Sequence, residues 1–88
     1  MQSRTIKINN RIGLHARPAA IFVKRSRDFE SEIILQKGTQ EVNGKSIIGI
    51  MALGAHYGDD ITIIAKGFDE ELAIEELSNL LASINEEE

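Results

Sequence analysis

The sequence predicts an α+β fold in which three helices cover one face of a four-stranded antiparallel sheet, in the order β-α-β-β-α-β-α. Three observations favour this fold: short segments in which apolar and polar residues alternate, longer segments with apolar residues at helical spacing, and turn residues between them. With 88 residues, 42% of them hydrophobic and 27% charged, we expect one domain that spans residues 1–88.

The first half of the chain contains three predicted strands and one predicted helix. Alternation predicts the first strand over residues 4–9, and apolar spacing predicts a helix over residues 16–27. Segments 31–36 and 39–43 are expected to pair as a hairpin because Gly38 lies between them. The helical side chains that we expect to be buried are Ala19, Phe22, Val23 and Ser26.

The second half contains a short helix, a fourth strand and a long final helix. Residues 45–54 are apolar and short, so Ser46 as N-cap and Gly54 at the C′ position are expected to bound a helix of about two turns. Alternation predicts a strand over residues 59–67, and Asp69 is expected to cap the last helix. The inward-facing residues of that helix should be Ala73, Leu77, Leu80, Leu81 and Ile84.

The pattern alone leaves two topologies open. The same order of elements without the last helix also describes ferredoxin-like domains. Both arrangements place a four-stranded antiparallel sheet beneath helices, so periodicity does not separate them.

The composition excludes several classes of protein. The chain has no cysteine, which rules out a disulfide scaffold and a cysteine-based zinc site and suits a reducing compartment. The N-terminal segment has no apolar signal-peptide core, and no apolar run approaches the roughly 20 residues that cross a bilayer. We therefore expect a cytoplasmic protein that does not associate with membranes.

The charges are segregated along the chain. Residues 1–27 contain seven bases and no acid, whereas residues 28–88 contain all fourteen acids and only three bases. The basic segment should attract a phosphate group or an acidic protein surface. Because the net charge is −4, nucleic acid is not an expected partner.

The sequence GLHARPAA, residues 13–20, points to phosphate chemistry. Pro18 fits the first turn of a helix, which places His15 at the boundary where free N–H groups and the positive end of the helix dipole lie. An unprotonated histidine is a nucleophile at neutral pH, and this position stabilises an anion attached to it. Arg17, which always carries its charge, is then expected to clamp a phosphoryl group on His15.

No second catalytic set accompanies His15. The sequence has no H-E-x-x-H motif, no P-loop and no legible Ser-His-Asp set. His56 precedes Asp59 and Asp60, but one histidine beside two carboxylates in a turn is weak support for a metal, and a solvated loop is expected. We therefore predict a carrier served by the active sites of other proteins, not an enzyme, with no metal and no cofactor.

A second motif, GKSIIGIMALG, predicts a docking surface with a switch. The apolar residues of this short helix cannot all be buried, so some of them are expected on the surface beside the bases of the first helix. A phosphate on Ser46 would add about −1.5 to −2 charges and repel an acidic partner without disturbing the fold. The expected docking residues are Leu14, Lys24, Arg27, Ile47, Ile48 and Met51.

These two motifs, at this spacing and in a chain of this size, resemble the HPr family, the histidine-containing phosphocarrier proteins of the bacterial phosphotransferase system. The resemblance covers essentially the whole chain and implies an open-faced β-sandwich. It implies that His15 accepts phosphate on Nδ1 from the phosphohistidine of enzyme I, itself charged by phosphoenolpyruvate, and passes it to EIIA domains. By the same resemblance, Arg17 steadies the phosphate and Ser46 is the serine that an ATP-dependent HPr kinase/phosphorylase modifies.

Several alternatives stay open at this stage. Both sugar-type and nitrogen-type phosphotransferase carriers fit the motifs, while His15 argues against the catabolite-repression paralogue, which lacks the active histidine. The chain could instead be a non-catalytic docking module for an enzyme or a transcriptional regulator, with Ser46 phosphorylation as its signal. A small ligand-binding domain of ferredoxin-like topology is the third possibility. A monomer is expected for so small a carrier.

Overall fold

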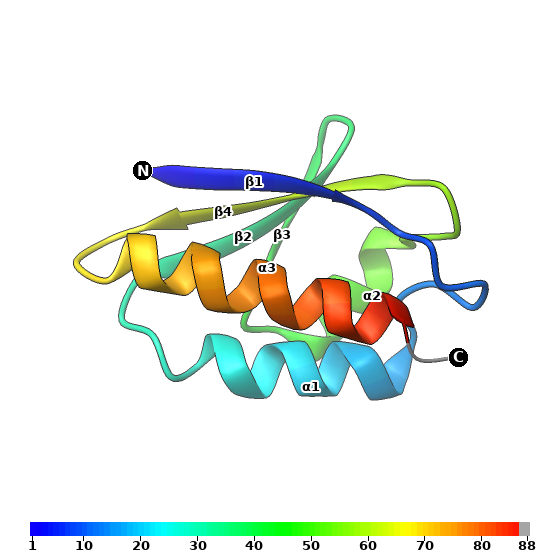
Figure 1. The fold of residues 1–88 in the computed structure, drawn as a ribbon, viewed down its shortest axis with the longest axis horizontal. Helices are drawn as coiled ribbons and strands as arrows, with labels where there is room; N and C mark the ends of the chain where they lie inside the picture. Colours follow the sequence, from blue (N-terminus) through cyan, green and yellow to red (C-terminus); the bar gives the residue numbers. More distant parts are fainter. Residues whose placement is uncertain (87–88) are drawn as a thin grey trace.

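The computed structural model describes residues 1–86, which form four strands and three helices in the predicted order (Figure 1). The strands are β1 (Gln2–Lys7), β2 (Glu32–Lys37), β3 (Gln40–Asn43) and β4 (Asp60–Lys66). The helices are α1 (Ala16–Ser26), α2 (Ile47–Leu53) and α3 (Glu70–Glu86). No helix within the described part of the chain is long and apolar enough to cross a membrane.

The sheet is antiparallel throughout, with the strand order β1-β4-β2-β3. The two central strands, β4 and β2, therefore pair with each other although they are far apart in the sequence. The register pairs Leu35 of β2 with Ile63 of β4, and both side chains are fully buried. On the opposite face, Thr5 and Thr62 share a hydrogen bond of 2.8 Å between their hydroxyl groups. The face that the helices cover is thus apolar, whereas the other face carries both polar side chains and the half-buried pair of Ile34 and Ile64.

All three helices lie on the apolar side of the sheet, with α1 and α3 next to each other (Figure 1). The predicted buried stripe of α1 is confirmed, because Ala19, Phe22, Val23 and Ser26 are all buried. In α3 the predicted inward residues are buried except Leu80, which is half-buried. This packing explains why an amphipathic pattern with a single apolar face appears in both helices.

The end of the first strand differs from the prediction for an identifiable reason. The first strand ends at Lys7 and not at residue 9, because Ile8 leaves the regular ladder. Its N–H donates to Asp59 O at 2.8 Å and its carbonyl accepts from Gly58 N at 2.7 Å, so the loop before β4 takes over the pairing.

The predicted capping role of Asp69 is wrong for its side chain. Asp69 does precede α3, and its carbonyl accepts from Ala73 N at 2.9 Å. Its carboxylate, however, accepts hydrogen bonds from Glu30 N (2.9 Å), Ser31 N (3.0 Å) and the Ser31 hydroxyl. The side chain thus holds the segment between α1 and β2, a tertiary contact that no local pattern could reveal.

Candidate functional site

The histidine motif is presented by a loop with its own hydrogen-bonded turn. Asn10 is 5% exposed, and its side-chain Oδ1 accepts from Ile12 N at 2.8 Å and from Gly13 N at 3.2 Å. The Asn10 carbonyl also accepts from Gly13 N, at 3.1 Å. An asparagine that bonds to backbone N–H groups two and three residues ahead forms an Asx-type turn. The loop before α1 is therefore ordered by a residue that the sequence analysis did not single out.

Gly13 brings this loop against the loop that precedes β4. Its φ of 80° lies in the left-handed region that favours glycine, and a Cβ at this position would collide with the carbonyl oxygen of Ala55. The next residue, Leu14, donates its N–H to that same carbonyl at 3.1 Å. The first half of the motif is thus fixed by backbone contacts immediately before His15.

His15 occupies the N-cap position of α1, as predicted. Its backbone is extended (φ −114°, ψ −165°), and its carbonyl accepts the first helical hydrogen bond from Ala19 N at 3.0 Å. The half-buried side chain makes no capping hydrogen bond, and no side chain of residues 1–84 bonds to its imidazole. An N-cap residue normally uses its side chain to satisfy the helix. Here the ring stays available for chemistry.

A cleft of about 220 Å³ lies beside His15. Arg17 carries the only charge among the described residues that line it, and no hydrogen bond or ion pair joins its guanidinium to the side chains of residues 1–84. Pro18 falls in the first turn of α1, as predicted, and Ile84 of α3 closes the other side. The cleft therefore combines a nucleophilic ring, an uncommitted cation and a helix N-terminus, which together suit a phosphoryl group.

The expected docking residues divide into exposed and buried ones. Ile48 is 81% exposed, Met51 46% and Ile47 38%, and Lys24 and Arg27 are also exposed. Leu14 is only 8% exposed and belongs to the core. Burial therefore leaves Leu14 little surface with which to contact a partner. The other five residues remain the predicted docking patch.

Ser46 is the N-cap of α2, as predicted. Its hydroxyl oxygen accepts from Gly49 N at 3.0 Å, and Gly54 ends the helix in a left-handed conformation. Arg27 of α1 donates to the carbonyl of Lys45 at 3.2 Å, which ties the basic end of α1 to the residue before Ser46. The half-buried Ser46 thus sits where the docking patch and a cation meet.

The loop that contains His56 is a structural support. Asp59 accepts from His56 N at 2.8 Å and lies 3.5 Å from the Lys37 ammonium. The backbone hydrogen bond from His56 N–H, together with Lys37, lowers the pKa of Asp59 below its ordinary value. Among the described residues no group of three or more His, Cys, Asp or Glu side chains is arranged to hold a metal ion.

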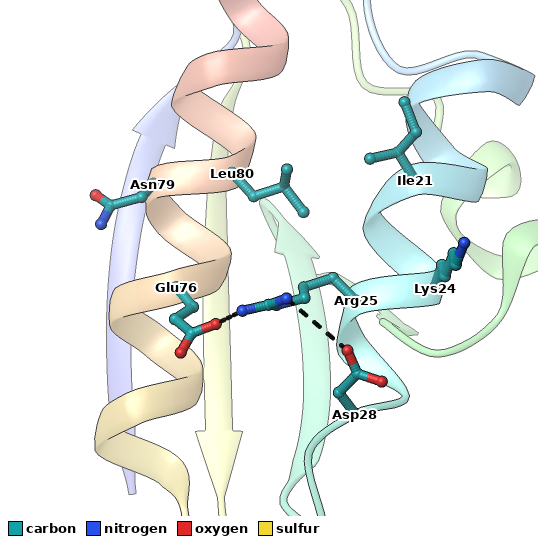
Figure 2. Close-up of a pocket in the computed structure, with 7 residues that line it drawn as sticks. All are labelled: Ile21, Lys24, Arg25, Asp28, Glu76, Asn79 and Leu80. Atoms are coloured by element: carbon teal, nitrogen blue, oxygen red, sulfur yellow. Dashed lines mark ion pairs between the residues drawn. The ribbon is translucent and has the colours of Figure 1, made fainter.

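A second hollow, of about 660 Å³, follows the line between α1 and α3. Figure 2 shows Ile21 and Leu80 facing each other across it, with Arg25 reaching from α1 to Glu76 of α3. Ile21 also lines the cleft beside His15, so the two hollows adjoin. The ion pair joins the two helices at the end of α1 away from His15.

Comparisons with known proteins identify the family of this chain. The family model described as "PTS HPr component phosphorylation site" matches residues 2–83. The phosphocarrier protein HPr of Treponema pallidum is 40% identical over the whole of both chains. The HPr-like protein Crh of Bacillus subtilis is 41% identical over 89% of this chain and 92% of its own.

A crystal structure of HPr from Thermoanaerobacter tengcongensis is 48% identical, with a TM-score of 0.92 over 100% of this chain and 99% of that one. A second structure from that organism, an HPr dimer, is 47% identical with a TM-score of 0.77 over 99% and 100%. The fold is therefore the open-faced β-sandwich, and the ferredoxin-like alternative is excluded. The chain belongs to the HPr family of phosphocarrier proteins. Because a relative forms dimers, the monomer remains a prediction.

Proposed function

We propose that this protein carries phosphoryl groups in the phosphoenolpyruvate-dependent phosphotransferase system, with His15 as the acceptor. The observation that carries the proposal is the uncommitted imidazole of His15 at the N-terminus of α1, beside an uncommitted Arg17. Membership of the HPr family supports it. The expected partners are enzyme I as donor and EIIA domains as acceptors, in the cytoplasm.

The transfer requires little of the carrier beyond position and charge. In its neutral form the His15 ring attacks the phosphorus atom on the phosphohistidine of enzyme I; on the family's pattern the attacking atom is Nδ1. The new P–N bond forms as the bond to the donor histidine breaks, and the donor ring leaves as a neutral imidazole once it has a proton. The same exchange, with EIIA as acceptor, returns His15 to its free state.

Two features of α1 stabilise the phosphoryl group during the exchange. The N–H groups of Ala16 and Arg17 belong to the first turn, where the helix supplies no carbonyl partner. They point toward an anion at the helix terminus, and the dipole adds to this attraction. The Arg17 guanidinium contributes a permanent positive charge and does not act as a general acid or base. Pro18 has no N–H to contribute, which leaves its role to shaping the turn.

Ser46 is proposed as the regulatory site of the same surface. A phosphate there would lie at the N-terminus of α2, next to Ile47 and Ile48 of the docking patch. The helix dipole would tolerate the charge, whereas an acidic partner approaching the patch would be repelled. An HPr kinase/phosphorylase is the proposed modifying enzyme.

The similarity to Crh favours one second candidate, a regulatory docking module. In that function Ser46 phosphorylation recruits a transcriptional regulator to the docking patch, and His15 takes no part. The two candidates differ in whether His15 is phosphorylated.

The test is phosphoryl uptake from phosphoenolpyruvate, Mg²⁺ and a purified bacterial enzyme I, followed by intact mass spectrometry. The proposal predicts one added phosphoryl group that is labile in acid and absent from His15→Ala. His56→Ala is the matched control, because it removes the other histidine and should leave uptake unchanged. No uptake by the folded wild-type protein would favour the docking module.

A further inference from the structure

We propose that Asn10 is a positioning residue for phosphoryl transfer: its buried side chain fixes the turn that delivers His15 to the start of α1. The inference rests on the proposed function of His15. Asn10 does not touch the reacting atoms in this account. It acts through the backbone of residues 12 and 13.

The hydrogen bonds of Asn10 converge on the segment immediately before the histidine. Oδ1 accepts from Ile12 N at 2.8 Å and from Gly13 N at 3.2 Å. Gly13 N has a second acceptor, the Asn10 carbonyl at 3.1 Å, whereas Ile12 N bonds to the side chain. Removing Oδ1 would therefore leave Ile12 N without its acceptor and allow the turn to open.

On one side, the turn contacts the loop that precedes β4. On the other side, its conformation depends on the hydrogen bonds to Asn10. Gly13 lies against the carbonyl of Ala55, and Leu14 N bonds to that carbonyl at 3.1 Å. Asp59 in turn holds this opposing loop through His56 N. Within the loop, the Asn10 side chain accepts hydrogen bonds from the backbone of residues 12 and 13, directly before Leu14.

Asn10 also lines the same cleft as His15 and Arg17. A shift of the turn would therefore change both the histidine position and the shape of the space that receives the phosphoryl group. A displacement of about 1 Å between reacting groups can cost up to about 100-fold in rate. Docking through the α1 and α2 side chains would be unaffected, because those residues lie outside the turn.

Three variants test the inference, with Asn9→Ala as the matched control on an exposed neighbouring asparagine. Asn10→Ala removes the acceptor, and Asn10→Ser restores one oxygen that can form the same turn more weakly. Phosphoryl uptake from enzyme I is measured as kcat and KM, and the urea midpoint of each variant shows whether it is folded.

We expect Asn10→Ala to lower kcat about 10- to 100-fold with KM unchanged, Asn10→Ser to recover part of the loss, and Asn9→Ala to match wild type. A kcat for Asn10→Ala equal to that of Asn9→Ala would overturn the inference, as would equal losses in the alanine and serine variants. If Asn10→Ala does not fold, Asn10→Ser decides: a lower kcat at constant KM supports positioning, and an unchanged kcat refutes it. Wild-type uptake on His15 in the same experiment separates this result from failure of the proposed function.

Discussion

Polar side chains near the two ends of α1 differ in whether they have hydrogen-bond or ion-pair partners. At the C-terminal end, the Asp69 carboxylate accepts three hydrogen bonds from residues 30 and 31, and Arg25 is paired with Glu76. At the N-terminal end, the side chains of His15 and Arg17 have no hydrogen bond or ion pair with the side chains of residues 1–84. Polar side chains that are hydrogen-bonded or ion-paired within the fold contribute to stability. Polar side chains without such partners are candidates for chemistry.

The available groups nevertheless stand on an ordered support. Asn10, Gly13 and Ala55 fix the chain up to the residue before His15. The comparison therefore separates two properties at one site: a rigid backbone and uncommitted side chains. Both are needed, because a reacting group gains from being held in position only if its functional atoms remain open.

The largest effect on transfer, after loss of His15 itself, is expected from Arg17→Ala. Removing the cation that faces the cleft should lower the transfer rate about 10- to 100-fold, as for loss of a charged transition-state contact. The affinity for enzyme I should change little, since the docking patch is intact. Rate and affinity are measured by rapid-quench kinetics and calorimetry, with Lys66→Ala, an exposed base on β4 outside the docking patch, as control. Equal losses of rate and affinity in Arg17→Ala would contradict the clamp role.

A smaller effect is expected when charge is added at the docking patch. Ser46→Asp should weaken enzyme I binding about tenfold, because like charges across an interface cost energy and slow association. Thr39→Asp adds the same charge at the exposed β2–β3 turn and should bind normally. Calorimetric titration with enzyme I measures both. Affinity of Ser46→Asp equal to that of Thr39→Asp would refute the switch.

Substitutions at two glycines distinguish the cost of backbone strain from the cost of a steric clash. Gly13 lies near His15, and Gly38 lies in the β2–β3 turn. Gly13 and Gly38 both have positive φ, at 80° and 60°, but a Cβ at Gly38 meets nothing within 4 Å. Gly38→Ala should cost about 1 kcal/mol of unfolding free energy, the strain alone. Gly13→Ala should cost about 2–3 kcal/mol, because the Ala55 carbonyl must also move. Urea denaturation measures the difference, and equal losses would show that the loop contact is not tight.

A change at Asp69, near the C-terminal end of α1, should lower the stability of the protein and leave phosphoryl transfer unchanged. The hydrogen bonds from the Ser31 hydroxyl and then from Glu30 N–H lower the pKa of Asp69 in the folded protein. A depressed folded pKa stabilises the fold at pH values above the unfolded pKa, about 3.9, and this contribution disappears as pH falls through the lower folded value.

Asp69→Asn should therefore be less stable than wild type at neutral pH, and the two should converge in acid. The urea midpoints of the two proteins, measured at several pH values between about 3 and 7, give the difference in stability as a function of pH. A constant difference across that range would contradict the assignment. A loss of phosphoryl transfer at neutral pH, in protein shown to be folded, would mean that the two ends are coupled.

The sequence predicted every element of the fold because its apolar periodicity is strong. Ser46, His15 and Pro18 were placed correctly, since each follows from local helix geometry. The Asp69 carboxylate was expected to cap its own helix, but it accepts hydrogen bonds from residues 30 and 31. Local patterns also did not reveal that Leu14, a predicted docking residue, is buried in the core. Both features arise from contacts between segments far apart in the chain, which local patterns do not contain.

The supporting residues of the site were harder to find than the reactive ones. His15 lies in a motif with proline and arginine at informative spacing. Asn10 is one of two adjacent asparagines in a polar stretch, and only the structure shows that its side chain is buried and bonded to the backbone. An asparagine three residues before a glycine was the available signal, and it was weak.

The most direct test of the account is the complete relay in a single turnover. Protein phosphorylated by enzyme I and freed from it is mixed with a purified EIIA domain, and the phosphoryl group is followed by radiolabel. We predict that label leaves this protein and appears on EIIA in equal amount, faster than it is lost to water, and that His15→Ala never carries it. Label that stays on the protein or passes only to water would contradict the carrier function.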